Sequence, residues 1–182
     1  VPKIRVASSS NTLVNKLVLA IEAAVRGGSI ALIENGHPIA SWHGEEAVSR
    51  AEDLLWNIAD LFERTQIDKH AVDLIAVSNG PGSYTGIRIG LATVQGLATS
   101  LNIKCAGLPL LPAIAQMHRK EAGCVVAIPI GRTELCWQNF EPGFDNGSLG
   151  TPCTGSADDL IEHFIGVPDF DLLLQQDAYN TV

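Results

Sequence analysis

The segment Leu74–Ser100, LIAVSNGPGSYTGIRIGLATVQGLATS, decides the fold class because it reads as a strand, a turn and a helix in succession. The apolar run Leu74–Ser78 predicts a short buried strand. Asn79–Gly82 predicts a turn, and Ser83 is a residue type that caps helix N-termini, so we expect a helix from Ser83 to about Ser100. A buried strand followed directly by a helix is typical of an α/β protein.

Glycines recur through this segment, although a glycine inside a helix costs about 0.5–1 kcal/mol relative to alanine. They are Gly80, Gly82, Gly86, Gly90 and Gly96. Phosphate binding is one explanation, but Ile87 and Arg88 stand where a P-loop needs Lys and Ser or Thr, and the spacing is not G-x-G-x-x-G. Close backbone packing along a strip of Gly82, Gly86 and Gly90 is the other. For any single glycine we favour the sheet of the same domain as the occupant of this strip, and for the whole set we favour a partner helix.

Three apolar runs upstream of this segment predict an antiparallel meander. They span Lys16–Ala24, Gly28–Glu34 and His37–Trp42. The Asn35-Gly36 pair tolerates positive φ and suits a tight hairpin turn between the last two. Next, Glu45–Thr65 predicts an amphipathic helix, because apolar residues at three- and four-residue spacing give it one apolar face. We expect that face to comprise Val48, Ala51, Leu55, Ile58, Ala59 and Phe62.

The order of elements predicts the architecture. Downstream, Lys104–Gly107 predicts a further strand, and Pro109–Arg119 predicts a helix that begins with the proline accepted in a first helical turn. Three strands followed by helix, strand, helix, strand and helix predict an α/β fold, a mixed sheet with flanking helices. This is the order of the ribonuclease H-like domain of the actin-like ATPase fold.

A partial second lobe is expected after that domain. Cys124–Ile130 and Glu134–Glu141 predict a hairpin, Pro142–Gly155 a loop, and Ser156–His163 a short helix. We therefore predict a flexible lead-in at residues 1–16, a ribonuclease H-like N-terminal domain at 17–120 and a partial, shortened C-terminal lobe at 121–182. The sequence contains no evident internal repeat.

Composition narrows the function classes. Of the 182 residues 46% are hydrophobic and 18% charged, the balance of a compact folded protein. The net charge of −8, without a cluster of Lys and Arg, argues against direct nucleic-acid binding. No apolar run reaches the ~20 residues that cross a bilayer. We expect a cytoplasmic protein, with an organelle stroma or matrix as the alternative because the lead-in contains Lys, Arg and Ser but no acid.

The glycine-containing segment resembles a known signature. NGPGSYTGIRIGLATVQGLA, from Asn79, is similar to the signature of the TsaB (YeaZ) family, the partner subunit in bacterial synthesis of tRNA threonylcarbamoyladenosine. The resemblance extends from about Leu17 to Glu141. It includes LVLAIEAAVRGGSIALIENG at the opening hairpin, LLWNIADLF in the first helix and GRTELCWQNFE in the hairpin after the third helix.

This resemblance implies a non-catalytic, actin-like subunit that pairs with a TsaD-like threonylcarbamoyl transferase. A TsaE-like ATPase in a larger complex and a homodimer are further expected partners. In the family the first two helices form the interface, which corresponds here to Glu45–Thr65 and Ser83–Ser100. The predicted interface residues are Val48, Ala51, Leu55, Ile58, Phe62, Gly82, Tyr84, Gly86, Ile87, Gly90, Leu91 and Val94.

Residues for catalysis are not evident, so we predict no catalytic, cofactor-binding or metal-binding residue. No two of His37, His43, His70, His118 and His163 have the spacing that places two ligands on one helix. Glu22-Ala23-Ala24 stands where relatives carry Asp-Thr-Ser, and we expect Glu22 to be a solvent-exposed carboxylate at a strand end. Ser83 lies in G-S-x-x-G and not in a G-x-S-x-G elbow. An ATP-dependent phosphotransferase or a metallopeptidase-like enzyme is the alternative function.

Overall fold

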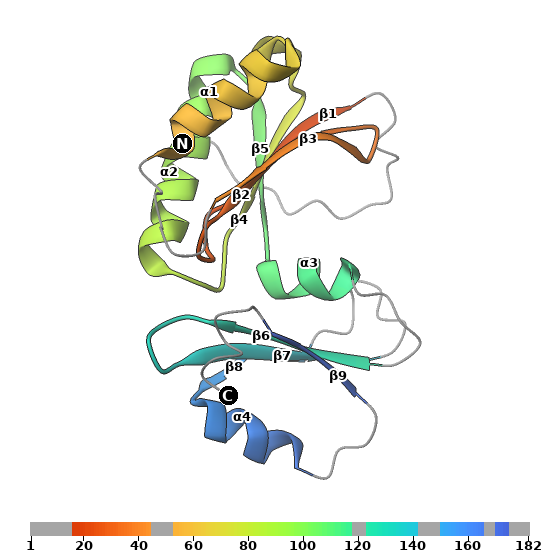
Figure 1. Cartoon of the computed structure of the whole chain (residues 1–182), viewed down its shortest axis with the longest axis vertical. Coiled ribbons are helices and arrows are strands. Elements are labelled where there is room, and N and C mark those ends of the chain that lie inside the picture. The colour runs from red at the N-terminus through yellow and green to blue at the C-terminus, as the bar shows by residue number, and fades with distance from the viewer. Residues whose placement is uncertain (1–15, 45–52, 118–122, 142–149, 166–169, 175–182) are drawn as a thin grey trace. The chain divides into compact units, whose positions relative to one another are not determined.

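A computed structural model describes residues 16–44, 53–117, 123–141, 150–165 and 170–174. The chain divides into two compact units. Residues up to 79 together with 84–108 form the first unit, and residues 80–83 together with those from 109 onward form the second. Each unit contains one sheet with helices packed on it (Figure 1).

The sheet of the first unit has the strand order β3-β2-β1-β4-β5. β1 pairs antiparallel with β2 and β2 with β3, whereas β4 is parallel to both β1 and β5. The strands are β1 (Leu17–Glu22), β2 (Ser29–Glu34), β3 (His37–His43), β4 (Leu74–Ser78) and β5 (Lys104–Leu108). This is the predicted meander followed by parallel strands, so the predicted fold class is confirmed. The Asn35-Gly36 turn is confirmed as well, because both residues have positive φ.

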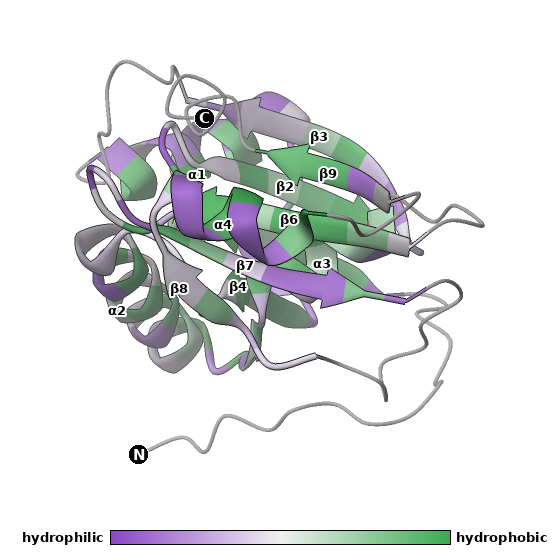
Figure 2. Ribbon diagram, turned by 90° about the horizontal axis from the view of Figure 1, so that it is seen from below, coloured by the Kyte–Doolittle hydropathy of each residue, from purple (hydrophilic) through white to green (hydrophobic). Residues whose placement is uncertain are grey.

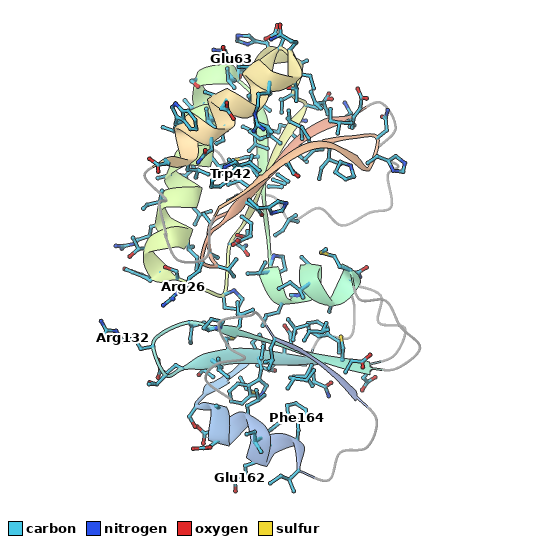
Figure 3. The ribbon with its side chains drawn as sticks, viewed as in Figure 1. Arg26, Trp42, Glu63, Arg132, Glu162 and Phe164 are labelled. Carbon is cyan, nitrogen blue, oxygen red and sulfur yellow. The ribbon has the colours of Figure 1, made fainter. Side chains whose placement is uncertain are left out.

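Two helices cover one face of this sheet, α1 (Leu54–Thr65) and α2 (Tyr84–Leu101). A short 3-10 helix, η2 (Lys69–Ala71), precedes β4. Alternate strand residues point toward the helices because side chains alternate across a strand. The buried core formed in this way comprises Leu17, Leu19, Ile21, Ile30, Leu32, Ile75 and Val77 from the strands with Leu54, Ile58, Leu61, Val94 and Ala98 from the helices. Trp42 of β3 packs against the same core (Figure 3).

The core-facing side of α1 differs from the predicted one. Leu54, Ile58 and Leu61 are buried, whereas Leu55 is 55% exposed and Ala59 is also exposed. Apolar residues at helical spacing fit two neighbouring rows of α1, one with Leu54, Ile58 and Leu61 and the other with Leu55 and Ala59. Packing against the sheet buries the row that contains Leu54. Val48 and Ala51 of the predicted face lie outside the described residues.

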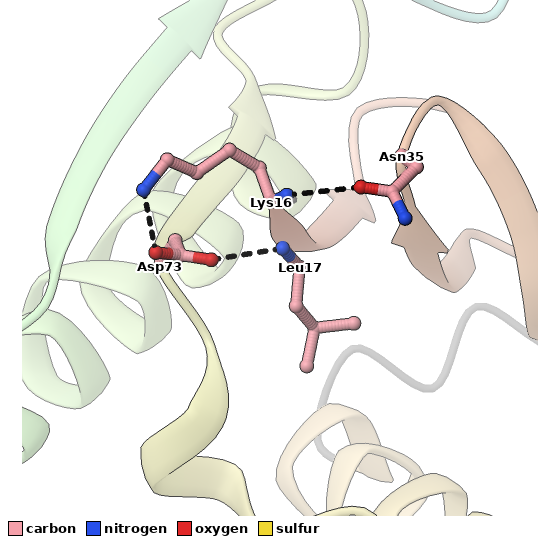
Figure 4. A network of polar contacts seen from close by, with 4 residues as sticks. All are labelled: Lys16, Leu17, Asn35 and Asp73. Atoms are coloured by element: carbon pink, nitrogen blue, oxygen red, sulfur yellow. Dashed lines mark hydrogen bonds and ion pairs between the residues drawn. The ribbon is translucent and has the colours of Figure 1, made fainter. Parts of the chain in front are cut away.

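Polar contacts fix the start of β1. The carboxylate of Asp73 accepts hydrogen bonds from the Lys16 ammonium (2.8 Å) and from the Leu17 backbone N–H (2.9 Å) (Figure 4). The Asn35 side-chain oxygen accepts one from the Lys16 backbone N–H (3.2 Å). The hydrogen bond from Lys16, more than any other contact, lowers the pKa of Asp73. The first strand is thereby held to the residue that leads into β4.

The buried side of α2 is a row of small residues. Gly86, Gly90, Val94 and Ala98 are four residues apart and are all buried. A Cβ atom at Gly90 would lie 3.1 Å from the Cβ of Ala23 and 3.7 Å from a methyl carbon of Val77, within the same unit. The helix backbone therefore approaches its own sheet at this point. At Gly90 the same domain therefore fills the strip, which is the explanation expected for a single glycine of the set.

The second unit has a four-stranded sheet with the order β8-β7-β6-β9. α3 packs on β6 and β7, and α4 packs on β7 and β8. The elements are α3 (Leu110–Met117), β6 (Gly123–Pro129), β7 (Leu135–Phe140), β8 (Cys153–Gly155), α4 (Ala157–Phe164) and β9 (Phe170–Leu174). β6 is mostly hydrophobic, whereas α4 carries hydrophilic residues on one side (Figure 2). Ser156 begins α4 with a complete capping box to Asp159.

The two sheets share a topology that the sequence did not reveal. In each, a three-stranded antiparallel meander is extended by a strand parallel to its first strand, β4 beside β1 and β9 beside β6. β8 lies within the predicted loop Pro142–Gly155, and β9 was not predicted. Helix α3, which lies within the range 17–120, groups with the second unit through its contacts with β6 and β7.

Two glycines of α2 should respond in opposite ways to an added side chain. Gly96 is exposed, and a Cβ atom added there would meet no neighbour within 4 Å among the described residues, so Gly96→Ala should raise the free energy of unfolding by about 0.5–1 kcal/mol. Gly90→Leu should lower it by about 1–3 kcal/mol, because the side chain must displace Ala23 and Val77. Urea denaturation followed by circular dichroism measures both. Equal effects of the two substitutions would contradict the packing described for Gly90.

Candidate protein-interaction surface

The outward side of α2 carries almost no charge. Arg88 is the one charged residue among the 18 of this helix. Most of its exposed positions, Thr85, Arg88, Ala92, Gln95, Gly96 and Thr99, fall on the side opposite the buried row of Gly86 and Gly90. A helix side that faces water in a soluble protein usually carries charged residues, and their depletion is a property of the centres of protein interfaces. This side of α2 therefore has the composition of a contact surface.

The neighbouring helix α1 adds large apolar side chains. Trp56 is 68% exposed, and Leu55 beside it is 55% exposed. α1 and α2 contact one another within the first unit (Figure 1). Large exposed apolar residues on a helix that contacts a nearly uncharged helix are typical of interaction sites. We call the exposed sides of α1 and α2 the helical surface, defined by Leu55, Trp56, Tyr84, Arg88, Ala92, Gln95 and Gly96.

An aromatic ring and a cation stack at the N-terminal end of α2. The guanidinium carbon of Arg88 lies 4.2 Å from the centre of the Tyr84 ring, and Tyr84 is 68% exposed. The four-residue spacing places the two side chains one above the other on the helix. Such a cation–π contact holds the guanidinium in a defined place while its edge stays accessible.

The predicted interface residues divide by exposure. Leu55 and Tyr84 are exposed, so both belong to the helical surface. Phe62, Gly82, Ile87 and Leu91 are partly buried. The buried ones are Ile58, Gly86, Gly90 and Val94, of which Ile58 and Val94 belong to the core of the first unit. Val48 and Ala51 lie outside the described residues.

Sequence reasoning missed Trp56 and Arg88 because it searched for apolar spacing. Trp56 lies two positions beyond Leu54, so it falls outside the row that contacts the sheet. The scarcity of charge along α2 was visible in the sequence and was the available signal for its outward side. A protein-interaction surface is indicated by a depletion of charged residues as well as by exposed apolar residues.

The end of β1 holds a partly buried carboxylate. One oxygen of Glu22 accepts hydrogen bonds from the backbone N–H groups of Ala24 and Val25 (3.0 Å) and from the Ser78 hydroxyl (3.1 Å). The other oxygen is buried and has no hydrogen-bond partner among the described residues. The prediction of a solvent-exposed Glu22 is therefore wrong: the side chain folds back to satisfy the turn after β1. Burial raises the pKa of Glu22, and these hydrogen bonds offset only part of that rise.

The described residues offer neither a metal-binding cluster nor a membrane-spanning helix. In the part of the chain that the structure describes, no three His, Cys, Asp or Glu side chains are grouped as ligands of one metal ion. His37, His43 and His70 are exposed in separate places, and His118 lies outside the described residues. None of the described helices has the length and hydrophobicity needed to cross a membrane.

Comparisons with known proteins agree with the resemblance. The family model described as TsaD, tRNA N6-adenosine threonylcarbamoyltransferase, matches residues 46–170. The tRNA threonylcarbamoyladenosine biosynthesis protein TsaB of Escherichia coli is 28% identical, over 68% of this chain and 54% of that protein. The protein of the same name from Haemophilus influenzae is 30% identical, over 66% of this chain and 52% of that protein. This chain thus spans about half the length of these relatives.

A solved structure extends the agreement to the fold. YeaZ from Pseudomonas aeruginosa superimposes with a TM-score of 0.64 at 26% sequence identity. The match covers 76% of this chain and 67% of that chain. The resemblance to the TsaB (YeaZ) family is therefore confirmed in both sequence and structure.

The Glu22 carboxylate should make stability depend on pH. Because its pKa is raised in the folded state, the folded protein loses stability as the pH rises from about 4.5 through the folded pKa. Glu22→Gln cannot ionise, so the variant should gain stability relative to the wild type over this range. Free energies of unfolding from urea denaturation, measured for both proteins from pH 4 to 8, give the comparison. A difference that stays constant with pH would rule out the raised pKa.

Proposed function

The chain belongs to the TsaD family of tRNA N6-adenosine threonylcarbamoyltransferases, in its TsaB (YeaZ) branch, and from this premise we propose that it is a non-catalytic interaction subunit. Its partner is a TsaD-like transferase subunit, and the pair is required for threonylcarbamoyladenosine modification of tRNA. A TsaE-like ATPase joins a larger assembly, and a homodimer is the form without the transferase. The site of action is aqueous and cytoplasmic.

One observation carries this proposal: the helical surface is exposed, carries the large apolar side chains Leu55 and Trp56 on α1, and is nearly uncharged on α2. Trp, Tyr and Arg are the residues most enriched where single side chains dominate binding energy, and Trp56, Tyr84 and Arg88 are all exposed here. A partner that covers this surface removes apolar area from water at little cost in desolvated charge. The choice of a transferase as partner rests on the match to the TsaD family model and on the TsaB relatives, whose names place them in threonylcarbamoyladenosine biosynthesis of tRNA.

Truncation of Trp56 should weaken the complex. Trp56→Ala removes the largest exposed apolar side chain of α1, so we expect the dissociation constant for the cognate transferase subunit to rise about 30-fold or more. Isothermal titration calorimetry with the two purified proteins measures this constant. Ile39→Ala is the matched control, because Ile39 is 45% exposed in the same unit but lies on β3.

Three outcomes decide between the proposals. Wild-type affinity of Trp56→Ala would exclude Trp56 from the interface. No complex between the two folded wild-type proteins by light scattering would overturn the proposed partner. Threonylcarbamoylation of tRNA by the transferase at full rate without this chain would overturn its requirement in the reaction.

The alternative function is an enzyme, an ATP-dependent phosphotransferase or a metallopeptidase-like protein. The buried free oxygen of Glu22 favours it, because a carboxylate at the end of the first strand is where an actin-like ATPase would orient a metal-bound water. A phosphotransferase must bind nucleotide unaided. We expect no heat of binding when ATP and Mg²⁺ are titrated into the chain, because Glu22 is already engaged by Ala24, Val25 and Ser78. Binding that Glu22→Gln abolishes would favour the enzyme.

A further inference from the structure

We propose that Arg88, held over Tyr84, pairs with a carboxylate of the partner subunit and thereby sets how the partner is oriented on the helical surface. This inference rests on the proposed function, because it concerns the same surface and the same partner. Arg88 is exposed, and its guanidinium lies 4.2 Å from the centre of the Tyr84 ring. The other residues of α2 are uncharged, so this is the one position on that helix where charge can specify the partner.

Covering Arg88 with a partner costs free energy, because the guanidinium loses its contact with water. A partner that covers the helical surface takes the guanidinium out of water, and a buried charge is tolerated only when it is paired. Among the described residues no acidic side chain forms an ion pair with Arg88. The Tyr84 ring provides a cation–π contact but no hydrogen-bond acceptor for the guanidinium edge. The missing acceptor must therefore come from the partner.

A carboxylate is the acceptor that best fits the Arg88 guanidinium. A guanidinium presents its N–H groups as a planar fork that fits both oxygens of a carboxylate. The first turn of α2 has no acidic residue to neutralise the positive end of the helix dipole, which adds to the attraction for an anion. An Asp or Glu side chain on the partner's facing helix has the matching charge and geometry.

A second copy of this chain is the other candidate source of the carboxylate. The exposed side of α2 has no carboxylate to offer to the Arg88 of another copy. On α1, Asp60 is already paired with Arg64 at 2.7 Å, which leaves Glu63 as the exposed carboxylate that a second copy could offer from the described part of that helix (Figure 3). We assign the carboxylate to the transferase subunit because the proposed function makes that subunit the partner of this surface.

The test compares Arg88 variants in binding to the cognate transferase subunit. Arg88→Ala should raise the dissociation constant about 30-fold or more, because it leaves the partner's carboxylate buried and unpaired. Arg88→Lys keeps the charge but not the fork, so its loss should be smaller. Tyr84→Phe keeps the ring and should bind as the wild type does. Arg132→Ala is the matched control, because Arg132 is an exposed arginine of the second unit (Figure 3).

A charge exchange identifies the pair directly. Each Asp and Glu on the helices of the transferase subunit is replaced by Arg and combined with Arg88→Glu, and one combination should restore the binding that each single change abolishes. Affinity of Arg88→Ala within about twofold of the wild type, with the fold intact by circular dichroism, overturns the inference and leaves the proposed function standing. So does the absence of any rescuing combination, or an Arg88 dependence seen in self-association and not in transferase binding. Wild-type protein that does not bind the transferase overturns the proposed function itself.

Discussion

The close approach of α2 to its own sheet is the constraint on which the rest of the first unit depends. At Gly90 there is space for a hydrogen atom but little for a methyl group, since Ala23 would lie 3.1 Å from an added Cβ. This contact brings Val94 and Ala98 onto the strands, where they join the core of Ile75 and Val77. Helix α1 then packs beside α2 and covers Trp42 and the strands of the meander. Gly90 lowers the intrinsic stability of the helix, but it allows α2 to pack on the sheet and bury the apolar residues of that face.

This orientation of α2 also determines the candidate interaction surface. Once the row of Gly86, Gly90, Val94 and Ala98 is buried, the opposite side of the helix has to face outward, with Arg88 and small uncharged residues. The same logic applies to α1, where burial of Leu54, Ile58 and Leu61 leaves Leu55 and Trp56 exposed. The exposed residues are therefore a consequence of core packing, and their composition is what makes the surface suitable for a partner.

The Glu22 carboxylate shows how a position associated with chemistry can take a structural role. Its oxygen accepts from two backbone N–H groups and from Ser78, so the side chain closes the turn after β1 and joins it to the end of β4. The Glu22 side chain is one methylene longer than the Asp that relatives carry here, so it can bend back to the backbone of its own turn. A carboxylate occupied in this way is poorly placed to hold a water molecule against a phosphate, which agrees with the role proposed for the chain.

The sequence by itself determined the order and type of most elements, because the local signals are strong: apolar runs in the strands, Asn35-Gly36 at a hairpin, and a helix after Gly82. It also identified the family, since the signature around Gly86 is long. Only the tertiary structure decided which side of each helix is buried, because Leu54 and Leu55 fit the helical period equally well until the sheet selects one. The short edge strand β8 and the parallel strand β9 were likewise settled by long-range pairing, which no local pattern of residues encodes.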